Sequence, residues 1–344
     1  MKQEMQETME QQVRASGLPA ENQEELIAIF RGEKLPLLSR DTIAKKIFSP
    51  EEHPERFDFV MQRVMQDPGI KSYHAAPTEG MYQNMYSKKV IGDIRAWLQD
   101  GRMADLEMQG VAQDFIFDRT DAYANNMLTL LYSTNVDQKK KEVNYKNMKG
   151  IVVVVLMAES PKVFKEFSSD RYIHRVKSIT TDTGMEFPTL KQMAFVQLDK
   201  ALELFLNETY NKDEDIELLK LLATIADINN DSVRGATSGE AFFDDIRDEV
   251  MLFSRSKEVQ AMLLDEDFAR LDWNSNYQSG VERGLEQGRE QGLEQGRVEG
   301  RTEGRTDLIQ RMLKNGKTEE EIAAFCDYPV EEIHQIAEKL SILT

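Results

Sequence analysis

The stretch that most constrains how this chain can fold is residues 89–109. Residues 90–98 and 103–109 alternate in character, which predicts two half-buried β-strands joined by a tight turn. The side chains of the second strand divide between an apolar face and a polar face, and the polar face carries Asp105, Glu107 and Gln109. The turn between the strands therefore decides which polar groups of the two strands meet.

Two turns are compatible with this sequence. A two-residue loop, Asp100-Gly101, pairs Asp93 with Met108 and leaves Glu107 on the other face. A three-residue loop, residues 99–101, pairs Asp93 with Glu107 and needs a left-handed residue at its last position, which Gly101 supplies. We therefore predict the three-residue loop.

In this register Arg95 lies beside Asp105, which is a favourable cross-strand pair. Asp93 and Glu107 lie opposite each other, with about 4.5–5.5 Å between their Cβ atoms, and repel unless a cation lies between them. Arg95 can screen only part of this repulsion, so a divalent metal with oxygen ligands is a natural occupant. The alternative is a solvent-facing hairpin with scattered charges, and the pattern alone leaves both interpretations open.

An Asp on one strand followed by Glu-x-Gln on the next resembles the PD-(D/E)XK nuclease superfamily, and most of all its transposase branch, the recombination-promoting nucleases. The matching positions are Asp93, Glu107 and Gln109. Residues 40–48, RDTIAKKIF, resemble the opening helix of the family, and the Gly-rich C-terminal tail is also typical of it. The resemblance covers residues 37–205 and the tail, and the order of the motifs makes it more specific than any one of them.

The resemblance implies an α/β fold of the restriction-endonuclease type, with a mixed sheet flanked by helices. It also implies a metal-dependent DNA endonuclease in which Asp93, Glu107 and the main-chain carbonyl of Met108 bind Mg²⁺, or alternatively Mn²⁺. Gln109 stands where most of the superfamily has Lys, as is normal for this branch. An amide can orient the attacking water, but it adds no positive charge and is no effective base.

Three further residues have two interpretations each. Asp41 lies four residues before Lys45, and such a pair stabilises a helix by about 0.2–0.5 kcal/mol. In the superfamily, however, an acid on the first core helix can approach the metal, so Asp41 is a secondary catalytic candidate. Arg119 and Tyr123 match an Arg-x-x-x-Tyr of the family and share one helix face, where they either contact each other or face a phosphate.

The remaining pattern predicts how the chain is organised. The β-branched run at residues 151–157 indicates a buried central strand, and an amphipathic helix at residues 113–135 precedes it, so the two strands around that helix are expected to be parallel. Further strands are expected at residues 70–74, 172–180 and 193–198. The predicted parts are a loosely attached N-terminal helical arm (1–36), a nuclease-like core (37–205), an acidic helical region (206–278), a glycine-repeat helix or linker (279–305) and a small C-terminal helical module (306–344).

Seven glycines recur at every fourth residue from Gly280 to Gly304. Each costs roughly 1 kcal/mol relative to Ala inside a helix, so a lone helix would be marginal. Close approach of a second helix along the glycines offsets this cost, which favours a homo-oligomer, although a flexible polar linker is the alternative. Packing of this kind inside a membrane is excluded, because Glu and Arg would lie in lipid.

The C-terminal module contains a predicted capping box that begins at Thr318. Its outline suits a helix-turn-helix, but residues 305–344 carry five Lys or Arg against eight Asp or Glu. Because DNA contacts need basic residues, a small interaction module is the preferred interpretation.

The charge distribution bears on partners and compartment. The net charge is −18, yet residues 136–177 carry ten Lys or Arg against five Asp or Glu, whereas residues 199–272 carry eight against nineteen. DNA therefore stays possible as a partner beside the predicted site. The single cysteine, Cys326, fits a reducing cytosol, and the longest apolar run is too short to cross a bilayer, so we expect a cytoplasmic protein without a membrane partner.

Two function hypotheses follow from these observations. The first, which is the leading hypothesis, is a Mg²⁺-dependent endonuclease that hydrolyses DNA phosphodiester bonds. The second is a non-catalytic assembly or regulatory protein on a nuclease-like fold, with the glycine-repeat tail as its working part. The acidic balance of the chain and the absence of the usual Lys favour the second hypothesis.

Overall fold

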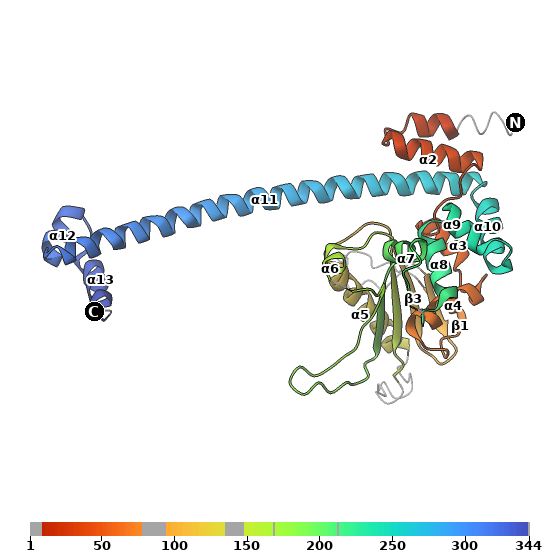
Figure 1. The fold of residues 1–344 in the computed structure, drawn as a ribbon, viewed down its shortest axis with the longest axis horizontal. Helices are drawn as coiled ribbons and strands as arrows, with labels where there is room; N and C mark the ends of the chain where they lie inside the picture. The colour runs from red at the N-terminus through yellow and green to blue at the C-terminus, as the bar shows by residue number, and fades with distance from the viewer. Residues whose placement is uncertain (1–8, 78–93, 135–147, 168, 212, 343–344) are drawn as a thin grey trace. The chain divides into compact units, whose positions relative to one another are not determined.

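A six-stranded mixed sheet organises the first part of the chain (Figure 1). The computed structural model describes residues 9–77, 94–134, 148–167, 169–211 and 213–342. The strand order is β1-β2-β3-β4-β6-β5, in which β3, β4 and β6 are parallel and the other pairs are antiparallel. The strands are β1 (Ser72–Ala75), β2 (Ile94–Leu98), β3 (Met103–Gln109), β4 (Ile151–Met157), β5 (Ile173–Arg175) and β6 (Lys191–Gln197).

Helices cover both faces of this sheet and form the whole C-terminal part. They are α2 (Ala20–Arg31), α3 (Asp41–Ile47), α4 (Pro54–Met65), α5 (Ile116–Thr134), α6 (Lys162–Glu166), α7 (Leu198–Leu206), α8 (Ile216–Ala226), α9 (Asp231–Thr237), α10 (Ala241–Phe253), α11 (Lys257–Lys314), α12 (Glu319–Cys326) and α13 (Val330–Ile342). The fold is thus mixed α/β with a C-terminal helical region, and it is consistent with the predicted restriction-endonuclease-like architecture.

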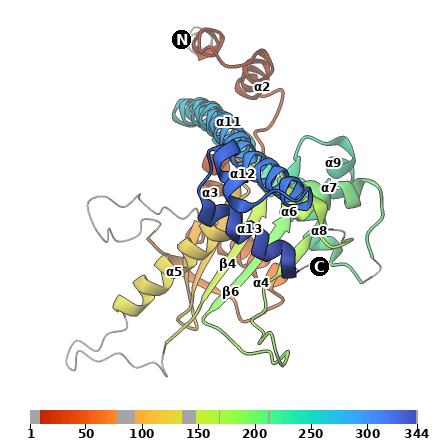
Figure 2. The same ribbon diagram turned by 90° about the vertical axis from the view of Figure 1, so that its left-hand side faces the viewer.

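The predicted parallel crossover is confirmed. α5 connects β3 to β4, the two strands pair in parallel, and all seven residues of β4 are buried, as expected for a central strand. Figure 2 shows α5 beside the strands β4 and β6. Close approach of the backbone at the start of β4 requires Gly150, because a Cβ atom there would lie 2.6 Å from the carbonyl oxygen of Leu190.

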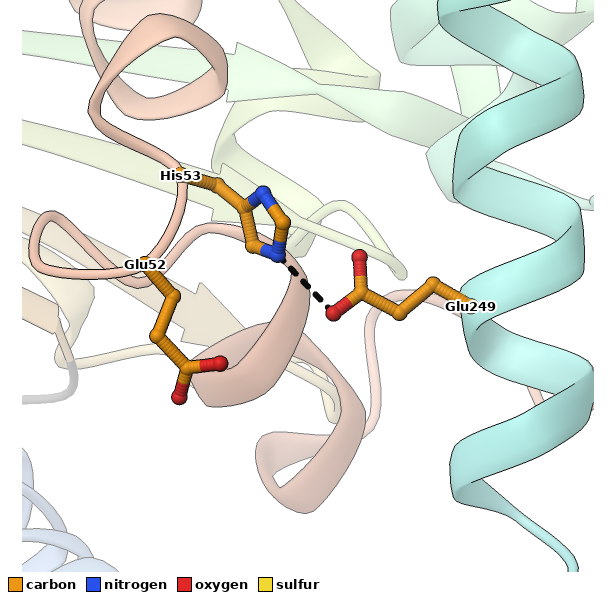
Figure 3. A group of neighbouring side chains, drawn as sticks. All are labelled: Glu52, His53 and Glu249. Atoms are coloured by element: carbon orange, nitrogen blue, oxygen red, sulfur yellow. Dashed lines mark hydrogen bonds and ion pairs between the residues drawn. The ribbon is translucent and has the colours of Figure 1, made fainter.

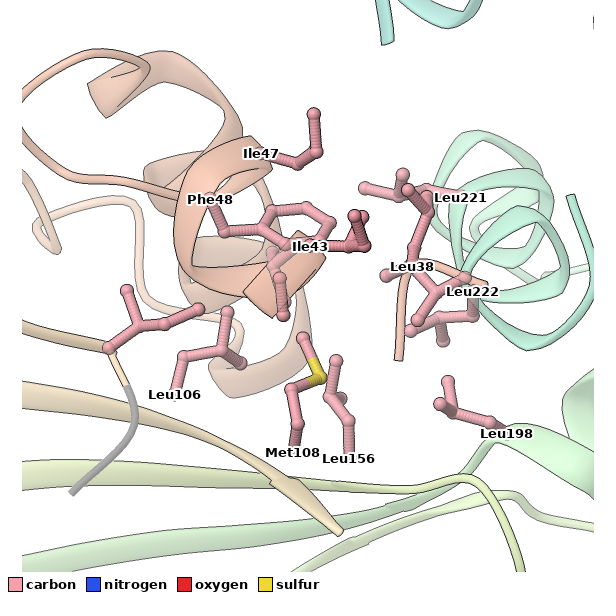
Figure 4. Close-up of a cluster of buried hydrophobic side chains, with 14 of the residues drawn as sticks. Leu38, Ile43, Ile47, Phe48, Leu106, Met108, Leu156, Leu198, Leu221 and Leu222 are labelled. Carbon is pink, nitrogen blue, oxygen red and sulfur yellow. The ribbon is translucent and has the colours of Figure 1, made fainter. Parts of the chain in front are cut away.

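The two faces of the sheet differ in their partners. Helices α3, α4 and α8 contribute to the apolar cluster on the first face, and α5 and Phe164 of α6 contribute to the cluster on the second. Figure 4 shows Ile43, Ile47 and Phe48 packed over Leu106 and Met108 on the first face. α5 and α6 lie together on the other side of the sheet in Figure 1.

The turn between β2 and β3 is the predicted three-residue loop. Trp97 lies opposite Met103, and the Leu98 backbone N–H donates to the Arg102 carbonyl at 2.8 Å. Gly101 has φ +87°, in the left-handed region that favours glycine. The prediction that Arg95 lies beside Asp105 is therefore confirmed as well.

Contacts divide the chain into two units, Met1–Ala269 and Arg270–Thr344. The predicted finer boundaries, near residues 36 and 205, stay predictions. α2 buries its apolar residues, Leu26, Ile27, Ile29 and Phe30, in the same cluster as α3 and α8. The N-terminal segment is therefore helical but packed into the first unit, and its description as loosely attached needs correction.

The glycine repeat is helical and lies within α11, a continuous helix of 58 residues. At the described glycines of the repeat, Gly280 and the five from Gly288 to Gly304, an added Cβ atom would meet nothing within 4 Å. Beyond the repeat, Ile309, Ile322 and Ile333 form a small core between the end of α11, α12 and α13. The predicted capping box at Thr318 is present. Among the described residues, no helix has both the length and the apolar character needed to cross a bilayer.

Candidate functional site

The second face of the β2–β3 hairpin carries a buried polar row. Arg95 is 1% exposed, Asp105 0%, Glu107 5% and Gln109 7%. The strands were predicted to be half-buried, and this prediction is wrong for β3, all of whose residues are buried. The reason is the helical layer of α5 on this face, which the alternating pattern of the strands does not reveal.

Arg95 and Asp105 form a buried ion pair in this row. Arg95 Nε donates to Asp105 Oδ2 at 3.0 Å, and neither side chain has any exposed surface. Burial raises the pKa of Asp105, while the charge of Arg95 and hydrogen bonds with Arg95 and Glu107 oppose this shift. Removal of either partner of such a pair would leave an unpaired charge in a buried site, which is strongly destabilising.

Glu107 lies two residues beyond Asp105 on the same face of β3, opposite Val155 of β4. Its carboxylate is close enough to Asp105 to influence the Asp105 pKa. The other predicted metal ligand, Asp93, lies outside the described residues. The described register ends with Ile94 opposite Leu106, one residue short of the predicted Asp93–Glu107 pair.

Gln109 is the last residue of β3, and its side-chain amide bonds to the main chain two residues further on. Its Nε2 donates to the Val111 carbonyl at 2.7 Å. This bond holds the side chain in place and leaves its carbonyl oxygen as the group that can accept a hydrogen bond or approach a cation. The position that most of the superfamily fills with Lys therefore holds a neutral, oriented oxygen in this chain.

Two other predicted residues are placed differently. The Met108 side chain belongs to the apolar cluster of the first face, so only its main chain can contribute to a site on the second. Asp41 begins α3, a helix whose buried residues join the first-face cluster, and its carboxylate pairs with Lys45 at 2.7 Å. The structure thus brings Glu107 and Gln109 together, and it gives Asp41 the helix-stabilising contact that its spacing predicted.

Arg119 and Tyr123 contact each other on α5. Arg119 Nε donates to the Tyr123 hydroxyl at 3.1 Å, and Arg119 Nη1 donates to Gln113 Oε1 at 3.1 Å. Gln113 is buried in the loop between β3 and α5. The first of the two interpretations, a contact between the two side chains, is therefore present, and a phosphate-facing role is still a prediction.

A hydrogen-bonded chain lies at the carboxyl ends of β4 and β6 and was not foreseen from the sequence. Gln197 Nε2 donates to Ser160 Oγ at 3.0 Å, and the Ser160 hydroxyl and backbone N–H both donate to Asp199, at 2.5 and 2.9 Å. His174 Nε2 lies 2.9 Å from Gln197 Oε1. Gln109, Met157 and Gln197 share one level of the sheet, so this chain lies at the same edge as Gln109. The sequence signalled only the Ser160-Pro161 turn.

One group of side chains elsewhere in the described residues has metal-ligand spacing, namely Glu52, His53 and Glu249 (Figure 3). His53 Nε2 contacts Glu249 Oε1 at 2.8 Å, and Arg56 Nη1 contacts Glu249 Oε2 at 2.6 Å. Lys46 pairs with Glu52 and also lies 3.6 Å from Glu249. Hydrogen bonds and coulombic attraction from Arg56 and His53 keep the pKa of Glu249 low despite the opposing effect of burial. Because two cationic side chains already neutralise these acids, the group joins α3 and α4 to α10 as an ion-pair network.

The motif order, the mixed sheet and the buried acidic row on β3 agree with an independent comparison. The model of the PD-(D/E)XK nuclease family transposases matches residues 39–280. The chain belongs to this family. Searches of the curated proteins and of the solved structures found no match.

Membership of a PD-(D/E)XK nuclease family indicates a nuclease-like protein, and such nucleases typically use divalent metals. The polar row fits such an ion in its chemistry, because carboxylate, amide and main-chain oxygens are the ligands that Mg²⁺ and Mn²⁺ accept. Asp105 Oδ1 is buried and has no hydrogen-bond partner among the described residues. A cation beside Glu107 would also lower the cost of keeping two acids in one buried row.

Proposed function

We propose that this transposase-family protein is a metal-dependent DNA endonuclease that hydrolyses phosphodiester bonds. The observation that carries the proposal is the row on β3, in which Glu107 and Gln109 share one buried face beside the Arg95–Asp105 pair. The described β2–β3 register, which ends with Ile94 opposite Leu106, supports the predicted pairing of Asp93 with Glu107. Asp93, Glu107 and the Met108 carbonyl are therefore our proposed ligands for Mg²⁺ or Mn²⁺.

A bound divalent metal would supply an activated water and would stabilise charge on the scissile phosphate. The chain's own groups have separate tasks. Gln109 Oε1 accepts a hydrogen bond from the attacking water and orients it, while the bond from Nε2 to Val111 keeps the amide from rotating. Because an amide accepts no proton, cleavage is expected to be slow near neutral pH.

The Arg95–Asp105 pair joins β2 to β3 two residues before Glu107. Its charges are fully buried, so the two strands cannot shift by a residue without exposing or unpairing a charge. This fixes the Glu107 side chain on the second face of the sheet. Asp41 remains a secondary catalytic candidate, proposed only from the resemblance.

The test is cleavage of supercoiled plasmid DNA in Mg²⁺, together with calorimetric titration of Mn²⁺. We expect Asp93→Asn and Glu107→Gln to abolish nicking and to weaken Mn²⁺ binding by at least tenfold, because each removes one charged ligand. Glu186→Gln is the matched control, since Glu186 is exposed on the β5–β6 connection and pairs only with Lys177 among the described groups. Undiminished nicking by Asp93→Asn would refute the assignment.

We further propose that the chain forms a homo-oligomer through the glycine row of α11. The support is the open space around each described glycine of the row, which leaves room for a second helix to approach closely. The same observation supports the alternative function, a non-catalytic assembly or regulatory protein. Loss of oligomers on removal of residues 279–344, together with an absence of Mg²⁺ and Mn²⁺ binding by the full chain, would favour that alternative.

DNA is the proposed partner and the cytoplasm the proposed compartment. The first rests on the family and on the basic balance of residues 136–177, and the second on the single cysteine, Cys326. Fractionation of cells that express the chain, with detection of nicked DNA in the same fraction, tests both. DNA recognition by the C-terminal module is not part of the proposal, and a fragment of residues 305–344 is expected not to bind DNA.

A further inference from the structure

A row of aromatic side chains continues the acidic row across the second face of the sheet. Glu107 of β3 is in register with Val155 of β4, Val155 with Phe195 of β6, and Phe195 with His174 of β5. Since neighbouring strands lie about 4.8 Å apart, the backbone of Phe195 is about 10 Å from that of Glu107. This distance is on the scale of one or two nucleotides of an extended strand.

The aromatic rings contact one another from α5 to the end of α6. Phe117 packs edge-to-face on Phe195, with 5.1 Å between ring centroids and 81° between ring planes, and lies 5.4 Å from Phe164. Phe164 in turn lies 5.1 Å from His174, and His174 lies 6.3 Å from Phe167. Phe164 and Phe195 are buried, whereas the two ends of the row are open: Phe117 is 46% exposed and Phe167 63%.

Two features make these open rings a rigid surface at the proposed site. Phe117 lies in the first turn of α5, the helix that follows β3, and Phe167 comes directly after α6, the helix that follows β4. Both residues therefore lie at the carboxyl edge of the parallel strands, and Gln109 lies at the same edge. The bonds from Ser160 to Asp199 and Gln197 fix the connection that leads into α6.

Lysines accompany the rings on α6. The side chains of Lys162 and Lys165 are 76% and 51% exposed. Their partners, Glu166 at 3.4 Å and Glu159 at 3.6 Å, are exposed as well, and such surface pairs are weak enough for a phosphate to compete with them. Exposed rings together with exposed cations are the combination with which proteins bind single-stranded nucleic acid, because each base presents a face for stacking.

We propose that Phe117 and Phe167, with Lys162 and Lys165, bind unpaired bases of a DNA strand, so that the preferred substrate contains a single-stranded segment next to the cleavage position. This inference rests on the proposed function and names its substrate class. In duplex DNA the base faces are covered by their neighbours, and a ring can reach them only at the cost of unstacking. The surface therefore selects frayed, looped or flapped DNA over continuous duplex.

Charge supplies little of this affinity. The flanking segments, residues 110–123 and 158–171, carry four Lys or Arg against six Asp or Glu. If both lysines contact phosphates, the slope of log K against log salt is about −1.4. Stacking of bases on the rings must supply the rest of the binding free energy, so substitution of the rings is the decisive test.

The experiment measures fluorescence anisotropy of a labelled 12-nucleotide oligothymidylate, and of the matching duplex, with the full chain in EDTA. We expect tighter binding to the single strand, and a loss of affinity of roughly 5- to 150-fold for Phe167→Ala or Phe117→Ala. Phe167→Trp should retain the affinity because it keeps a ring. Phe325→Ala is the matched control, since Phe325 is also a largely exposed phenylalanine (78%) and lies on α12, and it should change nothing.

Equal affinity of Phe167→Ala and the wild type, or tighter binding to the duplex, would overturn the inference. If Phe167→Ala instead changes the molar mass measured by light scattering and leaves DNA affinity unaltered, the rings contact another protein copy and the assignment to nucleotides is wrong. The proposed nuclease function fails separately. Ring-dependent binding without any Mg²⁺-dependent cleavage leaves this inference intact and refutes the nuclease, whereas cleavage that is insensitive to Phe167→Ala does the reverse.

Discussion

Replacing Arg95 with methionine is expected to destabilise the first unit strongly, and by an amount that depends on pH. Methionine keeps much of the aliphatic stem of Arg95 but leaves the Asp105 carboxylate without its cation in a site with no exposed surface. Removing one partner of a buried ion pair typically costs about 3–5 kcal/mol. The structure also sets an upper limit on this cost, because the carboxyl can take up a proton instead.

That limit follows from the Asp105 pKa. An Asp with its ordinary pKa of 3.8 costs about 4 kcal/mol to protonate at pH 7 and about 1.6 kcal/mol at pH 5, at roughly 1.4 kcal/mol per pH unit. Burial already raises the pKa of Asp105 in the folded wild type, so both limits are somewhat lower. We therefore expect Arg95→Met to lower the free energy of unfolding, relative to the wild type, by about 3–4 kcal/mol at pH 7 and by less than about 2 kcal/mol at pH 5.

The sign of this pH dependence follows from proton binding. Because the folded state of the variant holds a proton on Asp105 above pH 3.8 and the unfolded state does not, its stability falls as the pH rises towards the folded pKa. The stability of the wild type is also expected to fall as the pH rises, but by less, since Arg95 opposes the effect of burial on the Asp105 pKa.

Urea denaturation followed by the fluorescence of Trp97, in a chain carrying Trp273→Phe, measures this change in the sheet itself. Lys177→Met is the matched control, because Lys177 forms an ion pair with Glu186 of nearly the same length, 3.1 Å, but both side chains are well exposed. It should cost no more than about 1 kcal/mol. An Arg95→Met variant as stable as Lys177→Met at pH 7, or one that loses more stability at pH 5 than at pH 7, would refute the reasoning.

Three other substitutions test separate features, each by urea denaturation or circular dichroism. Gly150→Ala should prevent folding or cost several kcal/mol, because its Cβ would lie 2.6 Å from the Leu190 carbonyl oxygen; a normal denaturation midpoint would contradict this contact. Ser160→Ala should cost about 1–3 kcal/mol, since it leaves the buried Gln197 and the half-buried Asp199 without their hydrogen bonds to the hydroxyl, and no loss would show that water replaces the hydroxyl. Gly292→Ala should raise helicity, with a gain of about 1 kcal/mol for a lone helix, but should weaken oligomers if the glycine row is their contact; unchanged oligomers would exclude that contact.

The β2–β3 hairpin shows which structural features could be predicted from the sequence and which could not. The alternation of β3 and the glycine at position 101 were enough to predict the loop length and the Arg95–Asp105 pair, because a three-residue loop permits only one register. The depth of burial could not be predicted, since it depends on α5, whose position is set by packing over β4 and not by local pattern. The placement of Asp93 against Glu107 stays a prediction.

The aromatic row marks the limit of pattern-based reasoning on this chain. Phe117, Phe164, Phe167 and Phe195 come from α5, from α6 and the residue after it, and from β6, and no spacing rule relates them. They meet because α5 and α6 each follow a parallel strand and thus begin at the same edge of the sheet. The same topological cause gathers Ser160, Gln197 and Asp199, which lie nearly forty residues apart at most.

The glycine row of α11 has a geometric consequence for any assembly built on it. Residues four apart on an α-helix are offset by about 40° around the axis, so seven of them wind through about 240°. A row of this kind is inclined about 26° to the helix axis, and two such rows that interlock make their helices cross at about −50°. One straight neighbour can therefore touch only a few consecutive glycines before the axes diverge. The repeat therefore provides several equivalent positions at which a second helix can cross α11. A second copy can bind at any one of these positions, move between them, or leave the others for a third copy.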